Sequence, residues 1–558
     1  MKLIECVPNF SEGRDTNKIE AIAAAIRDVD GVALLDVDPG KDTNRTVMTF
    51  VGPPEAVLEA AFQGIQKAAQ VIDMSKHHGA HARLGATDVC PFIPVSDVTM
   101  DECVDLAVKL GRRVGNQLVI PVYLYEFAAS REERKNLATI REGEYEGLAE
   151  KLQHPDWQPD FGVGIFNPRS GAVVIGAREF LIAYNINLNT RDEAIARDIA
   201  FAIRERGRAK RDSDNNILRD EKGEIIYEPG IFPAVKAVGW YMDDFGRAQI
   251  SINLINYKVS PLHLVFDECC RLAEERGVRV TGSELVGLIP LQAVLAAGRH
   301  YLTKQGKTAG VPESELIHIA VLSLGLDDLY PFKPEEKIIE YRIRRQSPLV
   351  SMRVDAFVDL LSTASPAPGG GSVAALCGAL GSALASMAVA LTHGKKGYEA
   401  VTDQMLEIGE QAQLLKQAFL DDVDRDTEAF KQVMAAWRLP KKNDEQKAVR
   451  DQAIQTATRQ ATLVPLQVLQ RCVQAAALAR AAVEQGNVNS ISDAGVGALS
   501  IRTAAKGAYF NVRINLSGLD DLKLRQDLLA AAEEAWQIVD QITEEAVKKV
   551  ESTFDQKR

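Results

Sequence analysis

A short segment near the front of the chain gathers side chains that can move protons. In KHHGAHARLGATDVCPFIPV (residues 76–95), His77, His78 and His81 precede Arg83, and the whole chain of 558 residues contains only eight histidines. An imidazole has an unperturbed pKa of about 6.5, so it can accept a proton in one step and return it in the next. Any one of these histidines alone would fit a surface position, but three beside an arginine indicate a site for transfer between two amines.

A metal centre is the main alternative for the same residues. His77 and His81 are four positions apart, as two zinc ligands on one helical face would be. No glutamate stands in the place that an HExxH motif requires, and Gly79 and Gly85 disfavour a regular helix. We therefore expect proton transfer and no metal.

A second candidate lies in LKQAFLDDVDRDTEAFKQVMAAWRLP, in the last third of the chain. Asp426 falls on a stripe of apolar residues spaced three and four apart, and that stripe consists of Phe419, Val423, Phe430, Val433 and Trp437. Burial of a carboxyl group raises its pKa, so Asp426 is predicted to be a proton donor near neutral pH. The neighbouring Asp421, Asp422 and Asp424 are interpreted as a solvated face.

Two glycine-rich segments suggest close approach of backbone to a ligand. GVGIFNPRSG (162–171) is no dinucleotide fingerprint, because Asn167 stands where the third glycine belongs. Gly369, Gly370 and Gly371 precede Ser372 at a predicted helix start, where backbone N–H groups could meet an anion. The alternative for these three glycines is a plain linker with a helix cap. Asp38 in LLDVDPG is predicted to end a strand, where it could hold substrate or simply form a turn.

The elements that position these residues indicate a multidomain chain. Up to about residue 340, strand-like and helix-like stretches alternate in the order β-α-β-β-α-β, and a similar order returns after residue 180. We therefore expect two α/β subdomains of the split-βαβ type, residues 1–180 and 181–340, each a sheet with a helix layer. The charged stretch at 207–230 is predicted to be an inserted surface hairpin or loop.

The remainder is predicted to be an all-α helical bundle, residues 353–558, after a linker at 341–352. VAALCGALGSALASMAVAL (373–391) has the length and lack of charge of a membrane span, but its Ala, Gly and Ser favour a closely packed buried helix. Small-residue helices of this kind suggest pairing with a second copy.

Composition excludes several classes of function. The formal net charge is -12 without a long basic run, so neither nucleic acid nor an anionic membrane is expected as a partner. The seven scattered cysteines and the N-terminus, which lacks a secretory signal, favour a reducing, cytoplasmic location.

The chain resembles a known enzyme family over nearly its whole length. ECVPNFSEG, LLDVDPGKDTNRTVMTFVGPPE, HGAHARLGATDVCPFIPV, GEYEGLAEKLQHPDWQPDFG and LGLDDLYPFKPEEKIIEY resemble glutamate formiminotransferase. SPAPGGGSVAAL, RLPK, GNVNSISDAGVGA and GAYFNVRINL resemble formiminotetrahydrofolate cyclodeaminase. The resemblance is therefore to the bifunctional formimidoyltransferase-cyclodeaminase family.

This resemblance implies two reactions of histidine breakdown. The formimino group of N-formimino-L-glutamate passes to N5 of tetrahydrofolate, the co-substrate, and the product cyclises to 5,10-methenyltetrahydrofolate with loss of ammonia. It implies that His81 is catalytic in the first reaction and Asp426 in the second. The implied partners are small molecules, including folates with polyglutamate tails, and other copies of the chain in a homo-oligomer from a dimer up to an octamer.

The resemblance and the residue types together give a set of candidate binding positions. They are Asp38, Arg83, Gly162, Val163, Gly164, Ile165, Phe166, Asn167, Pro168, Arg169, Ser170, Gly171, Gly369, Gly370, Gly371, Asn487 and Asp493. Asn487 and Asp493 either line the second site or cap helices. Two competing hypotheses are a methenyltetrahydrofolate cyclohydrolase in the helical part and a non-catalytic oligomeric scaffold.

Overall fold

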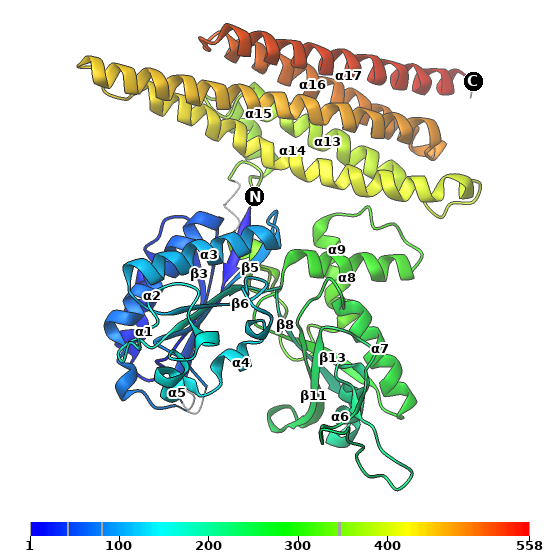
Figure 1. Cartoon of the computed structure of the whole chain (residues 1–558). Helices are drawn as coiled ribbons and strands as arrows, with labels where there is room; N and C mark the ends of the chain where they lie inside the picture. The colour runs from blue at the N-terminus through cyan, green and yellow to red at the C-terminus, as the bar shows by residue number, and fades with distance from the viewer. Residues whose placement is uncertain (1, 42–43, 80–81, 344–347, 557–558) are drawn as a thin grey trace. The chain divides into compact units, whose positions relative to one another are not determined.

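The computed structural model describes residues 2–41, 44–79, 82–343 and 348–556 (Figure 1). The chain separates into two compact units: Met1–Val294 with Leu324–Arg344, and Leu295–Ser323 with Arg345–Arg558. The first is mixed α/β and the second is helical, which confirms the predicted change of architecture along the chain.

The front of the α/β unit is built on a seven-stranded sheet. Its strand order is β1-β4-β2-β5-β7-β6, with β3 paired to β4. The strands are β1 (Leu3–Cys6), β2 (Asn9–Phe10), β3 (Ala33–Gly40), β4 (Arg45–Gly52), β5 (Thr87–Ser96), β6 (Val122–Glu126) and β7 (Val173–Ala177). Helices α1 (Thr16–Arg27), α2 (Pro54–Val71) and α3 (Met100–Gln117) bury their apolar stripes with side chains of this sheet in one core. Two short helices, α4 (Leu137–Arg141) and α5 (Glu144–Lys151), follow β6.

A second, four-stranded sheet has the order β11-β12-β8-β13 and is antiparallel throughout. Its strands are β8 (Ile182–Leu188), β11 (Val235–Met242), β12 (Arg247–Leu254) and β13 (Val280–Val286). Helices α6 (Glu193–Ile203) and α7 (Leu262–Glu275) pack on it. The charged stretch predicted as an insertion contains the short pair β9 (Arg208–Ala209) and β10 (Tyr227–Glu228), and its residues are mostly exposed. The unit ends with α10 (Pro334–Lys337) and α11 (Ile339–Ile343).

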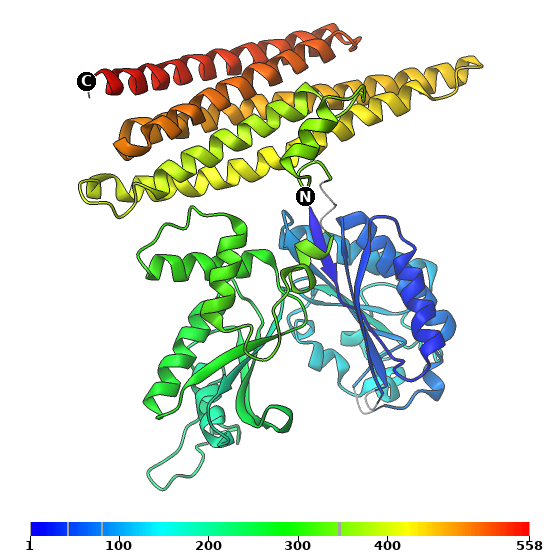
Figure 2. The ribbon, with the colours of Figure 1, turned by 180° about the vertical axis from the view of Figure 1, so that it is seen from behind.

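Five long helices dominate the helical unit, which Figure 2 shows from behind. They are α13 (Gly370–Ala390), α14 (Thr402–Trp437), α15 (Asp444–Gln485), α16 (Ile491–Leu516) and α17 (Leu522–Gln556). The shorter α8 (Leu291–Lys304), α9 (Glu313–Leu324) and α12 (Val354–Leu361) complete the described helices of the chain, with the first turn of α8 in the α/β unit.

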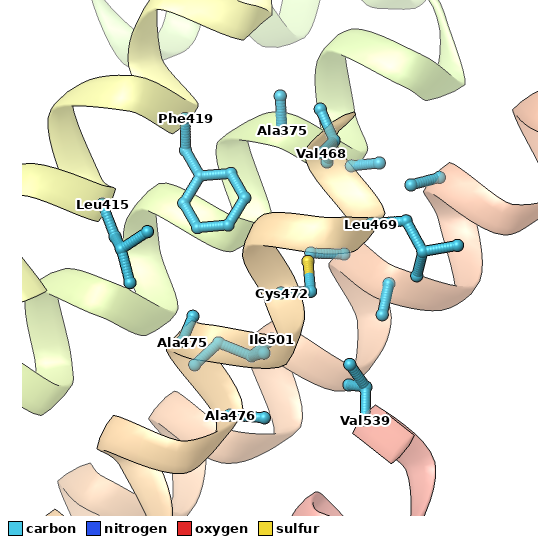
Figure 3. Close-up of a cluster of buried hydrophobic side chains, with 14 of the residues drawn as sticks. Ala375, Leu415, Phe419, Val468, Leu469, Cys472, Ala475, Ala476, Ile501 and Val539 are labelled. Atoms are coloured by element: carbon cyan, nitrogen blue, oxygen red, sulfur yellow. The ribbon is translucent and has the colours of Figure 1, made fainter. Parts of the chain in front are cut away.

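The small residues of α13 have a packing reason. A Cβ at Gly378 would lie 2.7 Å from the Phe419 ring, and a Cβ at Gly381 would lie 2.5 Å from Ile501. Figure 3 shows Phe419 in the core formed with Ala375, Leu469, Cys472 and Ile501. Within the described ranges α13 alone has the length and apolar character of a membrane span, and 56% of that window is buried inside the structure. Close helix packing therefore explains its composition.

Two candidate active sites

The first candidate site lies where a loop enters β5. His81, the predicted catalytic residue, lies outside the described residues. The described residues His77, Asn44 and Arg83 form the site as the structure gives it. His77 follows a single helical turn, and its Nε2 donates to the Asn44 carbonyl over 2.8 Å. Its Nδ1 accepts from Arg83 Nε at 3.4 Å. Burial and the nearby Arg83 charge lower the pKa of His77, so this ring is neutral and fixed in one tautomer.

Asn44 connects three loops around this site. Its side chain accepts from Gly13 N–H at 3.0 Å and donates to the His78 carbonyl at 2.9 Å. Its backbone is in the left-handed region, with φ 50°, a conformation that asparagine tolerates better than most residues. Asn44 thus joins His77 and His78 to the segment near Gly13 at the start of the chain.

Arg83, a predicted binding residue, is only 6% exposed and is paired within the protein. Its guanidinium donates to Glu144 at 2.8 Å and to Glu146 at 2.6 and 2.9 Å, both at the start of α5. The hydrogen bonds from Arg83 to Glu146 raise the pKa of the arginine, so the charge is permanent. Arg83 therefore lines the site and also fastens its own segment to α5.

A small pocket opens between these residues. Its walls are mostly polar: Asn9, Phe10, Ser11, Asn44, Arg45, His77, Arg83 and Asp88. Asp88 is buried, pairs with Arg141 and accepts from Leu84 N–H at 3.0 Å. Sequence reasoning missed Asn44 and Asp88. A lone aspartate inside the apolar strand TDVCPFIPV was the available signal for Asp88.

The predicted folate segment, residues 162–171, ends beside this loop. Gly171 has φ 66° and bridges Gly85, where a Cβ would lie 2.3 Å from the Ala172 carbonyl oxygen. Asn167 Oδ1 accepts from the backbone of Arg169 at 3.1 Å and of Ser170 at 3.0 Å. The structure thus brings the two predicted segments together.

The front of the same segment is open. Gly162, with φ 84°, packs against the backbone of Gly115, and Gly164 is exposed. Val163 and Ile165 are 45% and 71% exposed. Phe166 packs on Tyr145, whose hydroxyl donates to the Pro168 carbonyl at 2.5 Å. Exposed apolar side chains on a braced loop suit a flat ligand.

Asp38 lies apart from these contacts. It is exposed on β3, opposite Val47, and the strand continues to Gly40. The expected strand end therefore comes two residues later than the sequence suggested, and among the described residues no hydrogen bond or ion pair joins the Asp38 side chain to the pocket lining.

The second candidate site lies where α13 begins. The Asp426 carboxylate on α14 accepts from the Ser372 hydroxyl at 3.1 Å and from the Ser372 backbone N–H. Ser372 Oγ also lies 3.2 Å from Thr427 Oγ1. Burial raises the pKa of Asp426 above its usual value, while the hydrogen bonds from Ser372 oppose that rise.

The glycines of this segment admit the carboxylate. Gly369 precedes the helix without a side-chain cap, so Asp426 of another helix satisfies one of the free N–H groups at the start of α13. A Cβ at Gly371 would lie 2.1 Å from Asp426 Oδ1, whereas at Gly369 it would meet nothing within 4 Å. Gly370 lies near Asn511 of α16.

The apolar stripe that predicted Asp426 is buried only in part. Phe419 and Val423 are buried, but Phe430 and Trp437 are 37% and 54% exposed. Asp426 lies at the boundary, because α13 begins beside it and covers only the earlier part of the stripe.

Asp422 corrects the interpretation of the neighbouring aspartates as a solvated face. It has no exposed surface and pairs with Arg471 and, at 2.6 Å, with Arg425. Burial raises the pKa of Asp422 and the arginines oppose the rise. Asp424 accepts from the backbone of Leu349 at 3.0 Å, so it fastens the segment before α12.

Asn487 and Asp493 lie at the other end of α13. Asn487 donates to the Leu391 carbonyl at 3.1 Å and accepts from Asn489 N–H at 3.0 Å, which caps a helical turn. Asp493 is in the first turn of α16. A helix of 21 residues is about 30 Å long, so the structure does not bring these residues to Asp426.

Two polar sites in two folded units define a protein with two separate candidate centres for proton transfer. Family models match three consecutive parts of the chain. Residues 3–178 match the formiminotransferase domain, N-terminal subdomain, residues 183–344 match the formiminotransferase domain, and residues 353–534 match formiminotransferase-cyclodeaminase.

Relatives of similar length agree with these matches. The chain is 42% identical to the formimidoyltransferase-cyclodeaminase of Dictyostelium discoideum, over 100% of this chain and 99% of that protein. It is 43% identical to that of Sus scrofa, over 96% and 97%. The methenyltetrahydrofolate cyclohydrolase of Methylorubrum extorquens is 41% identical over 32% of this chain and 86% of that protein. The chain belongs to the formiminotransferase-cyclodeaminase family.

Proposed function

We propose that the chain carries out two consecutive steps of histidine degradation on a folate. It transfers the formimino group from N-formimino-L-glutamate to N5 of tetrahydrofolate, and it then cyclises 5-formiminotetrahydrofolate to 5,10-methenyltetrahydrofolate with release of ammonia. Full-length similarity to relatives named for both activities supports this assignment. The observation that carries it in the structure is a half-buried acid, Asp426, held at the start of a helix in its own folded unit.

His81 is proposed as the proton carrier of the transfer. N5 must lose a proton as it attacks the formimino carbon, and the glutamate nitrogen must gain one to leave. One imidazole serves both steps in turn, for an acceleration of about 10²- to 10⁴-fold. The neutral His77, held by Asn44 and Arg83, is a structural neighbour in this scheme.

The loop at 162–171 is proposed to hold the folate. Its exposed Val163 and Ile165 offer apolar contact to a flat ring, and its far end adjoins Gly85. This arrangement places the proposed folate segment beside the loop that carries the histidines. Polyglutamate tails are proposed to extend from the bound folate.

Asp426 is proposed as the acid of the second reaction. Once N10 has attacked the formimino carbon, the amino group leaves as ammonia only after it gains a proton. The raised pKa of Asp426 keeps the carboxyl group protonated nearer to neutral pH. Because N10 and the formimino carbon belong to one molecule, orientation supplies much of the rate.

The test is an assay of the full chain with formiminoglutamate and tetrahydrofolate. Methenyltetrahydrofolate absorbance and ammonia should rise together after a lag. Failure of the first reaction, with supplied 5-formiminotetrahydrofolate still deaminated, would remove the transferase assignment alone. No turnover of either substrate would favour a scaffold.

A second candidate for the helical unit is hydrolysis of methenyltetrahydrofolate. The similarity to a methenyltetrahydrofolate cyclohydrolase favours it, since opening the ring amidine needs an acid of the same kind. Release of ammonia from 5-formiminotetrahydrofolate distinguishes the two, because the hydrolase reaction produces none.

We further propose the layout and setting of the enzyme. Two α/β subdomains, residues 1–180 and 181–340, form the transferase, and residues 341–352 link it to the deaminase at 353–558. We propose a cytoplasmic location and a homo-oligomer, at least a dimer. The assembly is supported by exposed apolar side chains on helices α13 and α16 and on the residue that follows α13: Leu380, Met387, Leu391, Val496, Leu499, Phe510 and Ile514. Light scattering of the purified chain tests the assembly.

A further inference from the structure

The four-stranded sheet of the α/β unit has one face with an unusual set of side chains. Its apolar face, which includes Ala237 and Ile250, is buried under α6 and α7, which Figure 1 shows along one side of the sheet. Because side chains alternate along a strand, the residues between them point to the opposite face. There the sequence places amides, a carboxylate and a tryptophan where a solvated face would carry lysines and glutamates.

The first row across this face is a fixed chain of hydrogen bonds. Trp240 on β11, Gln249 on β12 and Asn187 on β8 stand opposite one another in register. The indole N–H donates to Gln249 Oε1 at 2.8 Å, and Gln249 Nε2 donates to Asn187 Oδ1 at 2.9 Å. Gln249 and Asn187 have no exposed surface. Buried amides that are fully bonded hold one orientation, so the indole ring is fixed.

The chain of bonds ends in a closed charge pair. Asn187 Nδ2 donates to Asp328 Oδ2 at 3.0 Å, and Arg247 pairs with the same oxygen at 2.9 Å. The Arg247 cation at the end of this network is therefore already matched by Asp328. What remains without an opposite charge is the carboxylate in the next row.

That carboxylate belongs to Glu284 on β13, beside Asn185 on β8. Its Oε2 accepts from Asn185 Nδ2 at 3.3 Å and from Gln249 Nε2 at 3.4 Å. In the part of the chain that the structure describes, Glu284 makes no ion pair and its second oxygen has no hydrogen-bond donor. A half-buried carboxylate braced by two long amide contacts is set to accept donors from outside the protein.

One amide separates this carboxylate from the indole. Gln249 receives the Trp240 N–H on its oxygen and contacts Glu284 through its nitrogen. Trp240 is 40% exposed, so its ring offers a flat surface near the acceptor. A flat group with two N–H donors on one edge matches both features, since a carboxylate accepts paired donors and an aromatic ring stacks on planar or cationic groups.

We propose that Glu284 is a specificity-determining residue of the transferase, which accepts the paired N–H donors of a planar N–C–N group while Trp240 lies against that group. This inference rests on the proposed function. Two substrates carry such a group: the 2-amino-4-oxo ring of tetrahydrofolate and the formimino group of formiminoglutamate. The shared chemistry is an N–C–N edge with two donors, and separate titration of each substrate tells which one binds.

The decisive variant is Glu284→Gln in the full chain. The amide keeps the shape but loses the charge and one acceptor, so KM for one of the two substrates should rise by about 10- to 100-fold while kcat changes little. Trp240→Ala should raise KM for the same substrate. Asn253→Ala, exposed on the same face one row further along, is the matched control and should leave both KM values unchanged.

Binding provides a second measurement. Titration of each substrate should quench part of the tryptophan fluorescence, and Trp240→Phe should lose that part for the substrate whose KM depends on Glu284. Deamination of supplied 5-formiminotetrahydrofolate and the melting temperature show that each variant is folded. If Glu284→Gln melts early, Trp240→Phe alone decides the matter by this titration.

The possible failures are distinct. A wild-type chain without transferase activity would remove the proposed function. An active wild type with Glu284→Gln within twofold of it in both KM values would overturn only the role of Glu284. A fall in kcat with both KM values unchanged would also overturn it, because the residue would then act on the chemical step.

Discussion

Gly371 lies directly against the Asp426 carboxylate: a Cβ added to residue 371 would lie 2.1 Å from Oδ1. Such a distance is far inside van der Waals contact, so either the acid or the start of α13 would have to move. Glycine at position 371 is therefore required for the proposed catalytic acid to lie where it does.

Gly371→Ala should reduce the deaminase kcat by about 100-fold, because a displacement of about 1 Å from productive geometry has that effect. Transfer of the formimino group should continue. Gly369→Ala, where a Cβ meets nothing within 4 Å, should lose far less. Steady-state assays of both steps check this, and equal losses for the two variants would contradict the steric explanation.

His81→Ala should abolish transfer and spare deamination of supplied 5-formiminotetrahydrofolate, and Asp426→Ala should do the reverse. The reason is that each residue carries the proton of one reaction only. Single-step assays with each substrate test the assignment. A folded variant that lost both activities would show that the division of labour is wrong.

Ser372→Ala should shift the pH profile of deamination upward. The two hydrogen bonds from Ser372 oppose the rise in the pKa of Asp426 that burial causes, so loss of the hydroxyl raises this pKa further. An acid must be protonated to act, and activity falls as pH passes above its pKa. The alkaline limb of kcat/KM should move to higher pH, with Ser372→Thr restoring the original profile. An unmoved limb would exclude Asp426 as the titrating acid.

Glu5→Gln should make the protein less sensitive to alkaline pH. Burial raises the pKa of Glu5 to about 7, while the Arg178 charge opposes the rise. Below pH 4.5, the ordinary pKa of this carboxyl group, Glu5 is protonated in both the folded and the unfolded chain and costs no stability. As pH rises from there to about 7, the unfolded chain loses the proton first, so the free energy of unfolding falls by about 3 kcal/mol. Thermal unfolding between pH 5 and 8 should show that the melting temperature of the variant rises relative to that of the wild type as pH rises. A constant difference would show that Glu5 does not titrate in this range.

Asn487→Ala should lower the melting temperature and leave the deaminase KM unaltered. The residue caps a helical turn and ties it to the end of α13, so its loss costs about 1 to 2 kcal/mol. Asn487→Asp keeps the acceptor of the cap but loses the donor to Leu391, so its melting temperature should lie between those of the wild type and Asn487→Ala. A raised KM without a change in melting temperature would return Asn487 to the folate site.

Periodicity and residue type predicted more of the fold than of the sites. The change from alternating elements to long helices is visible in the spacing of apolar residues, and the small residues of α13 indicated close packing. The burial of Asp422 could not be predicted, because its partner Arg471 comes from α15, far along the sequence. For the same reason sequence alone could not show that the glutamates of α5 neutralise Arg83.

Among the candidate site residues, Asp426 gave the clearest signal in the sequence. Asp426 was identified because it interrupts an apolar stripe of its own helix. In the structure the start of α13 lies at this interruption, where Ser372 bonds to the carboxylate. Asn44 left no comparable mark, since its role depends on three loops meeting.

Because Asp426 supplies the missing cap of α13 from a different helix, the reactive group and the first turn of that helix form a single cooperative element. Any stress that frays this turn would free the carboxyl group to water and return it to an ordinary acid. Under mild denaturant, ammonia release should therefore disappear while the helical circular dichroism of the bundle is still intact, which makes turnover an early sensor of local opening.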